Sequence, residues 1–283
     1  MKPAGKRSRS FKMTKTNSSR EVMAMITPEE ILAGRVLTDL EMRKTPIDVF
    51  AIARKEKIKL CPTQCASDFC GRLEYLPELG KFLLFYPDHP EADHNSRIRF
   101  SIGHELGHYY IEEHRERLMR GEFHSSQSGF ICDKELEMQA DSFASGLLLP
   151  ERTLTRFLQS KSREFLTLRE VLQLAEQCAT SRECAAIRYA KFAEEKCIVV
   201  VSMGGSVVYA ISSDDAERIR LLIKRGSQVP AQSSARRATS AVTENEIKGT
   251  AWVPWTKVHT LSEESIALGY GGLVLTLLSY SKT

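Results

Sequence analysis

Two histidines and a glutamate between Arg99 and His114, in the segment RFSIGHELGHYYIEEH, have the residue types and the spacing of a metal site. Because four residues make slightly more than one helical turn, His104 and His108 project from the same face of a helix and both imidazoles can reach one ion. Glu105 lies about 100° further round the helix, where its carboxylate can contact a metal-bound water rather than the metal. This arrangement predicts metal-assisted hydrolysis with Glu105 as the general base.

The third ligand has to come from elsewhere, because a catalytic zinc usually takes three protein ligands and leaves its fourth position for water. A second helix is predicted from DKELEMQADSFASGLLLP, where Glu137 and Asp141 lie four residues apart on one face, with Ala140 and Ala144 keeping the surface between the helices small. We predict Glu137 as the ligand and Asp141 as the acceptor for the N–H of a ligand histidine. One alternative is that Asp141 is the ligand. The other is that Glu137 and Asp141 are both exposed charges on a solvated face of the helix.

The helix that carries HExxH is predicted to run from about Ser96 to Glu113. Phe100, Ile102 and Leu106 give it an apolar side to bury while the histidines face a cleft. Gly107 in the helix interior costs about 1 kcal/mol relative to alanine, which indicates that a neighbour packs closely there.

Two capped helices and a hairpin are predicted upstream. Thr27 and Glu30 form a capping-box pattern around Pro28, which suits a first helical position, and Thr45 or Asp48 caps the next helix. The segment GRLEYLPELGKFLLFYP then predicts strands over residues 72–75 and 81–86, joined by a turn over residues 77–80.

The pattern changes from helical to β-like after residue 196. Before it, three short helices are predicted from ERTLTRFLQS, TLREVLQLAEQC and TSRECAAIRYAKFAEE, the last capped by Thr180 or Ser181. Trp252 and Trp255 are interpreted as core aromatics, with anchoring of a partner as the alternative. The elements expected after residue 196 are a hairpin turned at Gly204–Gly205, a helix over 214–224, a mobile loop, lid or linker over 226–240, and β-like stretches over 250–261 and 273–280.

Two blocks of the sequence, RIRFSIGHELGH and ELEMQADSFASGLLLP, together resemble the ImmA/IrrE family of metallopeptidases. The resemblance covers about residues 27–192 and includes LQLAEQCATSRECAAIRY, with Cys178 where the family has an aromatic residue and Thr180 where it has valine. Asp141 replaces the commoner asparagine. The matching residues are Arg97, Arg99, Phe100, Ser101, His104, Glu105, Gly107 and His108, then Glu137, Ala140, Asp141, Phe143, Ala144, Leu147, Leu148 and Pro150.

The resemblance implies a zincin-like fold with one zinc ion in a gluzincin-like site. It also implies cleavage of regulatory proteins in the cytosol, often helix-turn-helix repressors. The expected fold class is therefore α+β, with a mainly helical metallopeptidase domain containing a small β-hairpin or sheet, followed by a smaller α+β unit.

Charge is distributed unevenly along the 283 residues. Residues 1–20 contain seven basic and no acidic residues, which is a charge of +7. Because the net charge of the whole chain is +4, the remaining residues together carry −3. We interpret the tail as a disordered leader, with a nucleic-acid arm as the alternative. The expected organisation is a basic tail over 1–22, the metallopeptidase domain over 23–195, and a regulatory or substrate-docking unit over 196–283.

The cysteines and the apolar segments indicate a cytoplasmic protein without a membrane span. Seven irregularly spaced cysteines do not make a disulfide framework. Cys61, Cys65 and Cys70 lack a CxxC pair, so a structural role is favoured over a second metal site. No apolar signal segment follows the basic start, and the apolar stretch Ile266–Tyr280 is too short to cross a bilayer.

The remaining histidines and two tyrosines have no definite catalytic role. His114 lies off the shared helical face and is expected to be exposed to solvent. The other expectations are surface positions for His89 and His94, a structural role for His259, and packing or surface roles for Tyr109, Tyr110 and His124, with stabilisation of the oxyanion as the alternative for these three.

Three functions compete. The first is a zinc endopeptidase acting on a protein substrate, and the intact Glu105 favours it because a scaffold needs no base. The second is a metal-binding interaction protein that controls a DNA-binding partner without cleaving it. The third is a DNA-binding protein that uses the tail and the helical pair LQLAEQCATSRECAAIRYAKF, but acidic residues offset the basic ones there, so direct nucleic-acid binding is not expected.

Overall fold

The structure is a computed structural model that describes residues 26–64, 70–121, 134–161, 166–193, 196–213, 216–254 and 256–280. The basic tail predicted for residues 1–22 lies outside the described residues, as do Cys65, His124 and Trp255.

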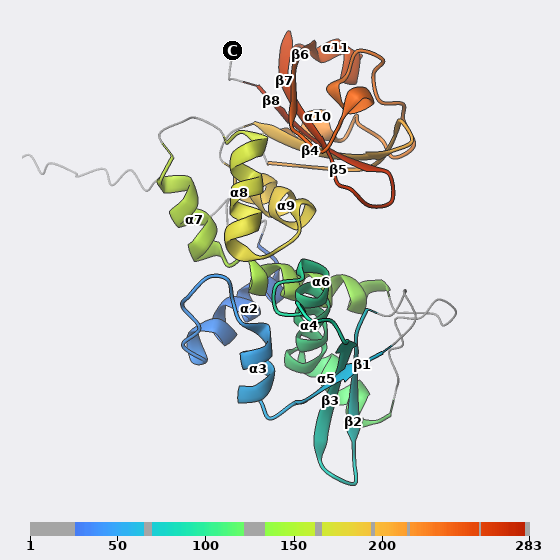
Figure 1. The fold of residues 1–283 in the computed structure, drawn as a ribbon. Helices are drawn as coiled ribbons and strands as arrows, with labels where there is room; N and C mark the ends of the chain where they lie inside the picture. The colour runs from blue at the N-terminus through green and yellow to red at the C-terminus, as the bar shows by residue number, and fades with distance from the viewer. Residues whose placement is uncertain are drawn as a thin grey trace, which may run out of the picture.

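The fold is α+β, as expected, with a small sheet and a larger sheet separated by helices (Figure 1). A three-stranded sheet in the order β1-β3-β2 lies beside the first group of helices, with β1 parallel and β2 antiparallel to β3. The elements of this part are α2 (Pro28–Asp39), α3 (Val49–Lys55), β1 (Lys59–Thr63), β2 (Arg72–Leu76), β3 (Lys81–Pro87), α4 (Ser96–Tyr110), α5 (Glu112–Met119) and α6 (Lys134–Leu148).

Three further helices lie between this part and an antiparallel sheet in the order β5-β4-β8-β7-β6 (Figure 1). The helices are α7 (Glu151–Gln159), α8 (Leu168–Cys178) and α9 (Arg182–Phe192). The remaining elements are β4 (Cys197–Met203), β5 (Ser206–Ser212), α10 (Glu217–Arg220), the short 3-10 helix η3 (Ser234–Arg237), β6 (Thr243–Lys248), α11 (Gly249–Trp252), β7 (Thr260–Ala267) and β8 (Leu273–Ser279).

Local capping signals place three helix starts as predicted. Thr27 and Glu30 form the capping box of α2, with Pro28 as its first residue. Asp48, rather than Thr45, accepts the capping hydrogen bond of α3. The side chain of Ser181 caps α9 by accepting from the backbone N–H of Cys184.

The HExxH helix is shorter than predicted. It ends at Tyr110, because Ile111 has extended backbone dihedrals (φ −75°, ψ 114°), and α5 begins at Glu112. Ile111 packs against the apolar core of the first part of the molecule, which favours the break. The chain therefore changes direction between the second histidine of the motif and His114.

Several predictions for the C-terminal part were wrong. The helix expected over residues 214–224 is limited to α10 among the described residues, and residues 249–252 form a short helix rather than a strand. The strands β1 and β6 were not predicted. The segment expected to be a mobile loop contains η3, which is fixed because buried Glu263 accepts from the Ser233 hydroxyl and from the backbone N–H of Ser234, both at 2.7 Å.

The five-stranded sheet buries both of its faces. Alternate residues of β4 point to opposite sides, so Val199 packs with α8 and α9 while Val200 packs with α11 and the segment around η3. Trp252 lies in the second cluster and its indole N–H donates to Glu263 at 2.8 Å, which makes it a core aromatic. A single apolar core is therefore shared by α8, α9 and the sheet, across residue 195.

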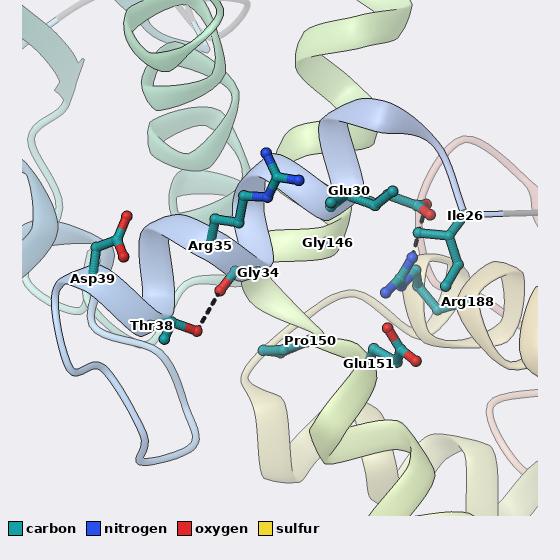
Figure 2. A pocket seen from close by; sticks show the side chains of 11 residues that line it. Ile26, Glu30, Gly34, Arg35, Thr38, Asp39, Gly146, Pro150, Glu151 and Arg188 are labelled. Atoms are coloured by element: carbon teal, nitrogen blue, oxygen red, sulfur yellow. Dashed lines mark hydrogen bonds and ion pairs between the residues drawn. The ribbon is translucent and has the colours of Figure 1, made fainter. Parts of the chain in front are cut away.

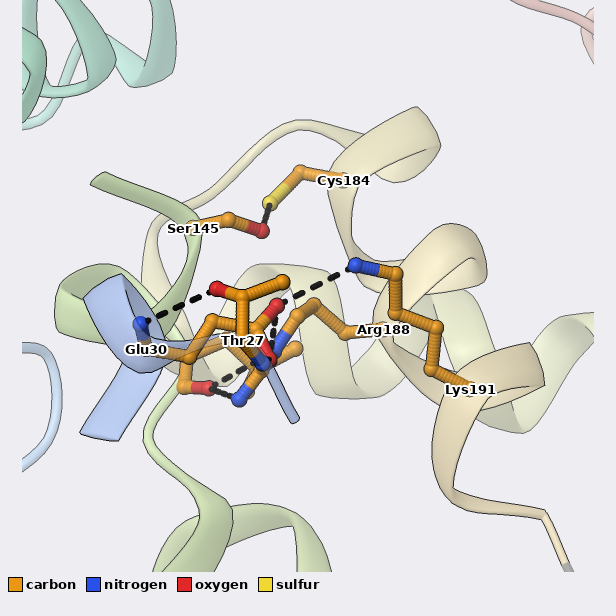
Figure 3. Close-up of polar contacts among 7 residues, drawn as sticks. Thr27, Glu30, Ser145, Cys184, Arg188 and Lys191 are labelled. Carbon is orange, nitrogen blue, oxygen red and sulfur yellow. Dashed lines mark hydrogen bonds and ion pairs between the residues drawn. The ribbon is translucent and has the colours of Figure 1, made fainter. Parts of the chain in front are cut away.

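A buried ion pair connects α2 to α9. Arg188, which is 1 % exposed, lies 2.7 Å from the Glu30 carboxylate through Nη1 and donates to the Leu149 carbonyl oxygen at 3.1 Å through Nη2. Lys191 donates to the same carboxylate at 3.2 Å (Figure 3). A side chain at Gly146 would place Cβ 2.9 Å from the Cα of Glu30, so glycine lets α6 pass close to the pair.

A cavity of about 300 Å³ opens beside this ion pair between α2, α6 and α9 (Figure 2). Its lining includes Gly34 and Arg35 of α2 together with Glu151 at the start of α7. The cavity is separate from the HExxH motif, since none of that motif's residues lines it.

Candidate metal centre

The two helices that carry the motif residues pack closely and antiparallel. A Cβ at Gly107 would lie 3.1 Å from the Cα and the carbonyl oxygen of Ala140, and one at Gly103 would lie 3.4 Å from the Cβ of Ala144. The close packing predicted from Gly107 is therefore present. It brings the first turn of α6, with Glu137, opposite the histidines of α4.

Three side chains converge on one point. The Nε2 atoms of His104 and His108 are 3.1 Å apart, and the Glu137 carboxylate oxygens lie 3.2 Å from His104 Nε2 and 3.7 Å from His108 Nε2. Ligand atoms about 2.0–2.1 Å from a tetrahedral zinc lie roughly 3.3 Å apart. Among the described residues these three form the group of histidine, cysteine and acidic side chains that could hold a metal ion.

Asp141 occupies the position expected of a supporting acceptor. Its Oδ1 lies 2.9 Å from Nδ1 of His104, the ring nitrogen that faces away from the cluster. A proton on Nδ1 leaves the lone pair of Nε2 available to a metal, so this contact orients His104 for binding. Asp141 is not a member of the three-residue group.

His114 was expected to be exposed, and this prediction was wrong. It is 0 % exposed, with Nδ1 at 3.0 Å from Nδ1 of His108 and Nε2 at 2.9 Å from the Gln139 side-chain oxygen. The expectation assumed one continuous helix, whereas the break at Ile111 turns α5 so that His114 points back to the motif. The spacing within the motif contained no signal for this contact.

Glu105 is buried at the edge of the three-stranded sheet. It is 6 % exposed, and a Cβ at Gly71 would lie 3.3 Å from its Oε1, so glycine leaves room for the carboxylate. Burial raises the pKa of Glu105 to about 7, with Glu137 also raising it, while His104 and the backbone N–H of Leu73 favour the charged form. The carboxyl group can therefore exchange a proton near neutral pH.

The cluster has the electrostatics of a cation site. Burial works against the charged form of His104, but hydrogen bonds to Asp141 and Glu137 and the charge of Glu105 outweigh it and raise the pKa of His104 to about 10. In the metal-free protein a proton thus supplies the positive charge that the surrounding carboxylates favour. Two imidazoles and a carboxylate are also a donor set of catalytic zinc sites, so these residues fit the ion.

The other candidate residues lie in ordinary packing or surface positions. Tyr109 donates to Glu56 at 3.1 Å, and Tyr110 stacks on Phe143 with ring centroids 5.6 Å apart. The imidazole of His94 is exposed, and His259, expected to be structural, is exposed as well. His89 is also exposed, and its Nδ1 accepts from the backbone N–H of Glu91 at 3.1 Å.

Cys61 and Cys70 are both half-buried, and the Cys70 sulfur accepts a hydrogen bond from Arg97 at 3.3 Å. No second metal-binding group is present in the part of the chain that the structure describes.

Fold and site together define a helical domain of the HExxH class, in which a neighbouring antiparallel helix supplies the third residue of a group that could hold a metal ion. Residues 87–189 match the family model of the IrrE N-terminal-like domain, Peptidase_M78. The matched range includes His104, His108 and Glu137, and also Asp141 and His114, which contact the two histidines.

A solved structure described as a Mycobacterium tuberculosis transcriptional regulator has a similar fold. Its TM-score is 0.60 over 92% of this chain and 81% of that chain, at 13% sequence identity. The comparison with curated proteins found no match. Within the described ranges, no helix is both long and apolar enough to cross a membrane.

Proposed function

We propose that this protein is a zinc-dependent endopeptidase that hydrolyses peptide bonds of a protein substrate. One observation carries the proposal: His104, His108 and Glu137 converge at the spacing of a tetrahedral site, with the buried carboxyl group of Glu105 on the same helix. A site with three protein ligands leaves the fourth position open, as catalytic zinc sites do.

Glu105 is the general base and acid of the proposed reaction. Zinc, when bound, supplies a Lewis acid that acidifies water and polarises the scissile carbonyl. The Glu105 carboxylate accepts a proton from the attacking water and delivers it to the leaving nitrogen, as the new C–O bond forms and the C–N bond breaks. The pKa of about 7 suits both transfers, since neither form of the carboxyl group is strongly disfavoured at neutral pH.

An extended substrate fits the strand next to Glu105. β2 is an edge strand of its sheet, and its residue Leu73 donates a backbone hydrogen bond to Glu105. Edge strands bind peptides by adding a strand, through main-chain hydrogen bonds. We therefore propose that the substrate lies extended along β2, with its scissile bond over the three-residue cluster.

The substrate class we propose is a DNA-binding regulator, such as a helix-turn-helix repressor, in the cytoplasm. The support for the substrate is the resemblance described above, and the similar solved structure is itself described as a transcriptional regulator. Cys61, Cys178 and Cys184 are free thiols, which is consistent with a reducing compartment.

Direct DNA binding by α9 is not part of the proposal. Arg188 is buried against Glu30, and Lys191 donates to the same carboxylate. Neither charge is available to a phosphate backbone without breaking these contacts.

The test compares zinc-loaded wild-type protein with Glu105→Gln and with Glu112→Gln, a matched control on the exposed surface of α5. Each is incubated with a cell proteome, and newly formed protein N-termini are identified by mass spectrometry. We expect new termini with the wild type and the control, and a decrease of about 10²–10⁴-fold in their rate of formation with Glu105→Gln at unchanged zinc content.

New termini that form equally fast with Glu105→Gln would contradict the assignment of the base. If no termini form although one zinc is bound, the protein controls its partner by binding without cleavage.

A further inference from the structure

We infer that His114 is a positioning residue for the metal: with Gln139 it holds His108 in the tautomer that exposes Nε2 to the ion. The inference rests on the proposed metal site and assigns a role to a buried histidine outside the HExxH motif. Three side chains from three helices form the chain of contacts: His108 of α4, His114 of α5 and Gln139 of α6.

The geometry determines which nitrogen of His108 faces the metal. Its Nε2 lies 3.1 Å from Nε2 of His104 and 3.7 Å from the Glu137 carboxylate, so Nε2 belongs to the cluster. Its Nδ1 points the other way and lies 3.0 Å from Nδ1 of His114. Both rings are shielded from water, at 2 % exposure for His108 and 0 % for His114.

Hydrogen-bond chemistry then places every proton along the chain. A neutral imidazole that offers the lone pair of Nε2 to a metal carries its proton on Nδ1, so His108 donates to Nδ1 of His114. His114 must accept there, and its own proton therefore resides on Nε2. That N–H donates to the side-chain oxygen of Gln139 at 2.9 Å. The Gln139 side-chain oxygen, which lies against Nε2, is the acceptor that this tautomer of His114 requires.

The two histidines of the cluster thus have different supports. His104 is held by Asp141, a carboxylate whose side chain is 57% exposed, whereas His108 is held by the buried imidazole of His114 and, through it, by half-buried Gln139. A carboxylate in place of His114 would put a negative charge at a fully buried position, and unpaired buried charges are costly. An imidazole supplies the required acceptor without that charge.

The experiment measures the zinc dissociation constant by competition with a chromophoric chelator, for the wild type and four variants. His114→Leu and Gln139→Leu each interrupt the chain, and Gln139 is only half-buried, so its replacement is the milder change. His94→Leu and Gln159→Leu are the matched controls, since both side chains are exposed. The melting temperature of each metal-free variant shows whether it is folded.

We expect His114→Leu and Gln139→Leu to weaken zinc binding by about 10–100-fold, as is usual when a partner of a metal ligand is lost, and the controls to bind as the wild type does. Gln139→Glu should restore tight binding, because it keeps an oxygen acceptor. Nitrogen NMR of the zinc-loaded protein should show the His114 proton on Nε2, a signal that a purely structural role would not require.

Wild-type affinity in both folded interrupting variants, or a His114 proton on Nδ1, would overturn the inference and leave the proposed metal site intact. A wild-type protein that binds no zinc would overturn the site itself and the inference with it. If His114→Leu does not fold, Gln139→Leu and Gln139→Glu decide the matter.

Discussion

At the scale of single residues, the two histidines of the cluster differ in the groups that surround them, and therefore in how strongly each holds a proton. His104 lies among carboxylates, with Asp141 at 2.9 Å and Glu137 at 3.2 Å, and these contacts raise its pKa to about 10. His108 contacts the imidazole of His114, rather than a carboxylate, on its far side. Protons and metal ions therefore compete most directly for His104.

Removing the Asp141 carboxylate should weaken the site through His104. We expect Asp141→Ala to lower zinc affinity by about 10–100-fold, since the acceptor that orients the ring is lost. Asp141→Asn should lower zinc affinity less than Asp141→Ala does, because the side-chain oxygen of asparagine can still accept a hydrogen bond from Nδ1 of His104. Zinc titration of both variants is the measurement, and equal losses in the two would show that charge rather than orientation is what Asp141 contributes.

Zinc affinity should increase with pH. In the metal-free protein the raised pKa of His104 means that its imidazole carries a proton throughout the neutral range, and this proton must leave before Nε2 can bind an ion. Loss of one proton predicts an affinity that rises about tenfold per pH unit between about pH 6 and pH 8. Titrations at three pH values test this, and a pH-independent constant would show that His104 is already neutral.

At the scale of elements, the site depends on the contact between α4 and α6. Gly103 and Gly107 lie along one side of α4, against Ala144 and Ala140, so the helix backbones approach closely. The ligands His104 and His108 come from one helix and Glu137 from the other. A shift between these helices would therefore change the distance between the nitrogen donors and the carboxylate.

Two glycine-to-alanine substitutions should have opposite effects. In Gly107→Ala the new Cβ would meet the backbone of Ala140 at 3.1 Å, so α6 must move, and we expect weaker zinc binding and a lower melting temperature. Gly34→Ala in α2 is the matched control, because nothing lies within 4 Å of its Cβ and helix propensity alone should stabilise the protein by about 1 kcal/mol.

Melting curves and zinc titrations of both variants make the comparison. Unchanged zinc affinity in Gly107→Ala would mean that the helix contact does not control the ligand geometry.

At the scale of the whole molecule, α9 connects the metal-binding part to the five-stranded sheet. One side of α9 shares the core that includes Val199 and Leu277 of the sheet, and another presents Arg188 to Glu30 of α2. Tyr209 of β5 and Tyr270 of the β7–β8 turn also donate to Glu183 of α9. The C-terminal unit is thus joined to the helical part by apolar, ionic and hydrogen-bonded contacts.

Glu30→Gln should destabilise the whole protein. The amide keeps an oxygen for the capping box of α2 but removes the charge opposite Arg188, which would remain buried without a counter-ion. Breaking a buried pair in this way costs about 3–5 kcal/mol. Denaturant unfolding of this variant, with Glu29→Gln as the control, measures the loss, and a change below about 1 kcal/mol would show that water reaches Arg188.

Patterns within single elements were predicted well. The motif helix, α6 and the hairpin β2–β3 follow from apolar periodicity, caps and turn residues that lie next to each other in the chain. The convergence of Glu137 with the histidines also follows, because small residues on two neighbouring helices allow one close packing. Strand β1 was missed, since its short segment contains a proline and is stabilised by pairing with β3 rather than by its own pattern.

By itself, the sequence determined the donor types, their helical spacing and the helix starts, because these depend on side-chain chemistry and on neighbours within one turn. Only the tertiary structure decided the burial of His114, the pairing of Glu30 with Arg188 and the fixing of the segment around η3 by Glu263. Each of these contacts joins residues from separate elements. Such contacts form only when the free energy gained from long-range packing exceeds the conformational entropy lost by the chain. A local pattern of residues does not determine that difference.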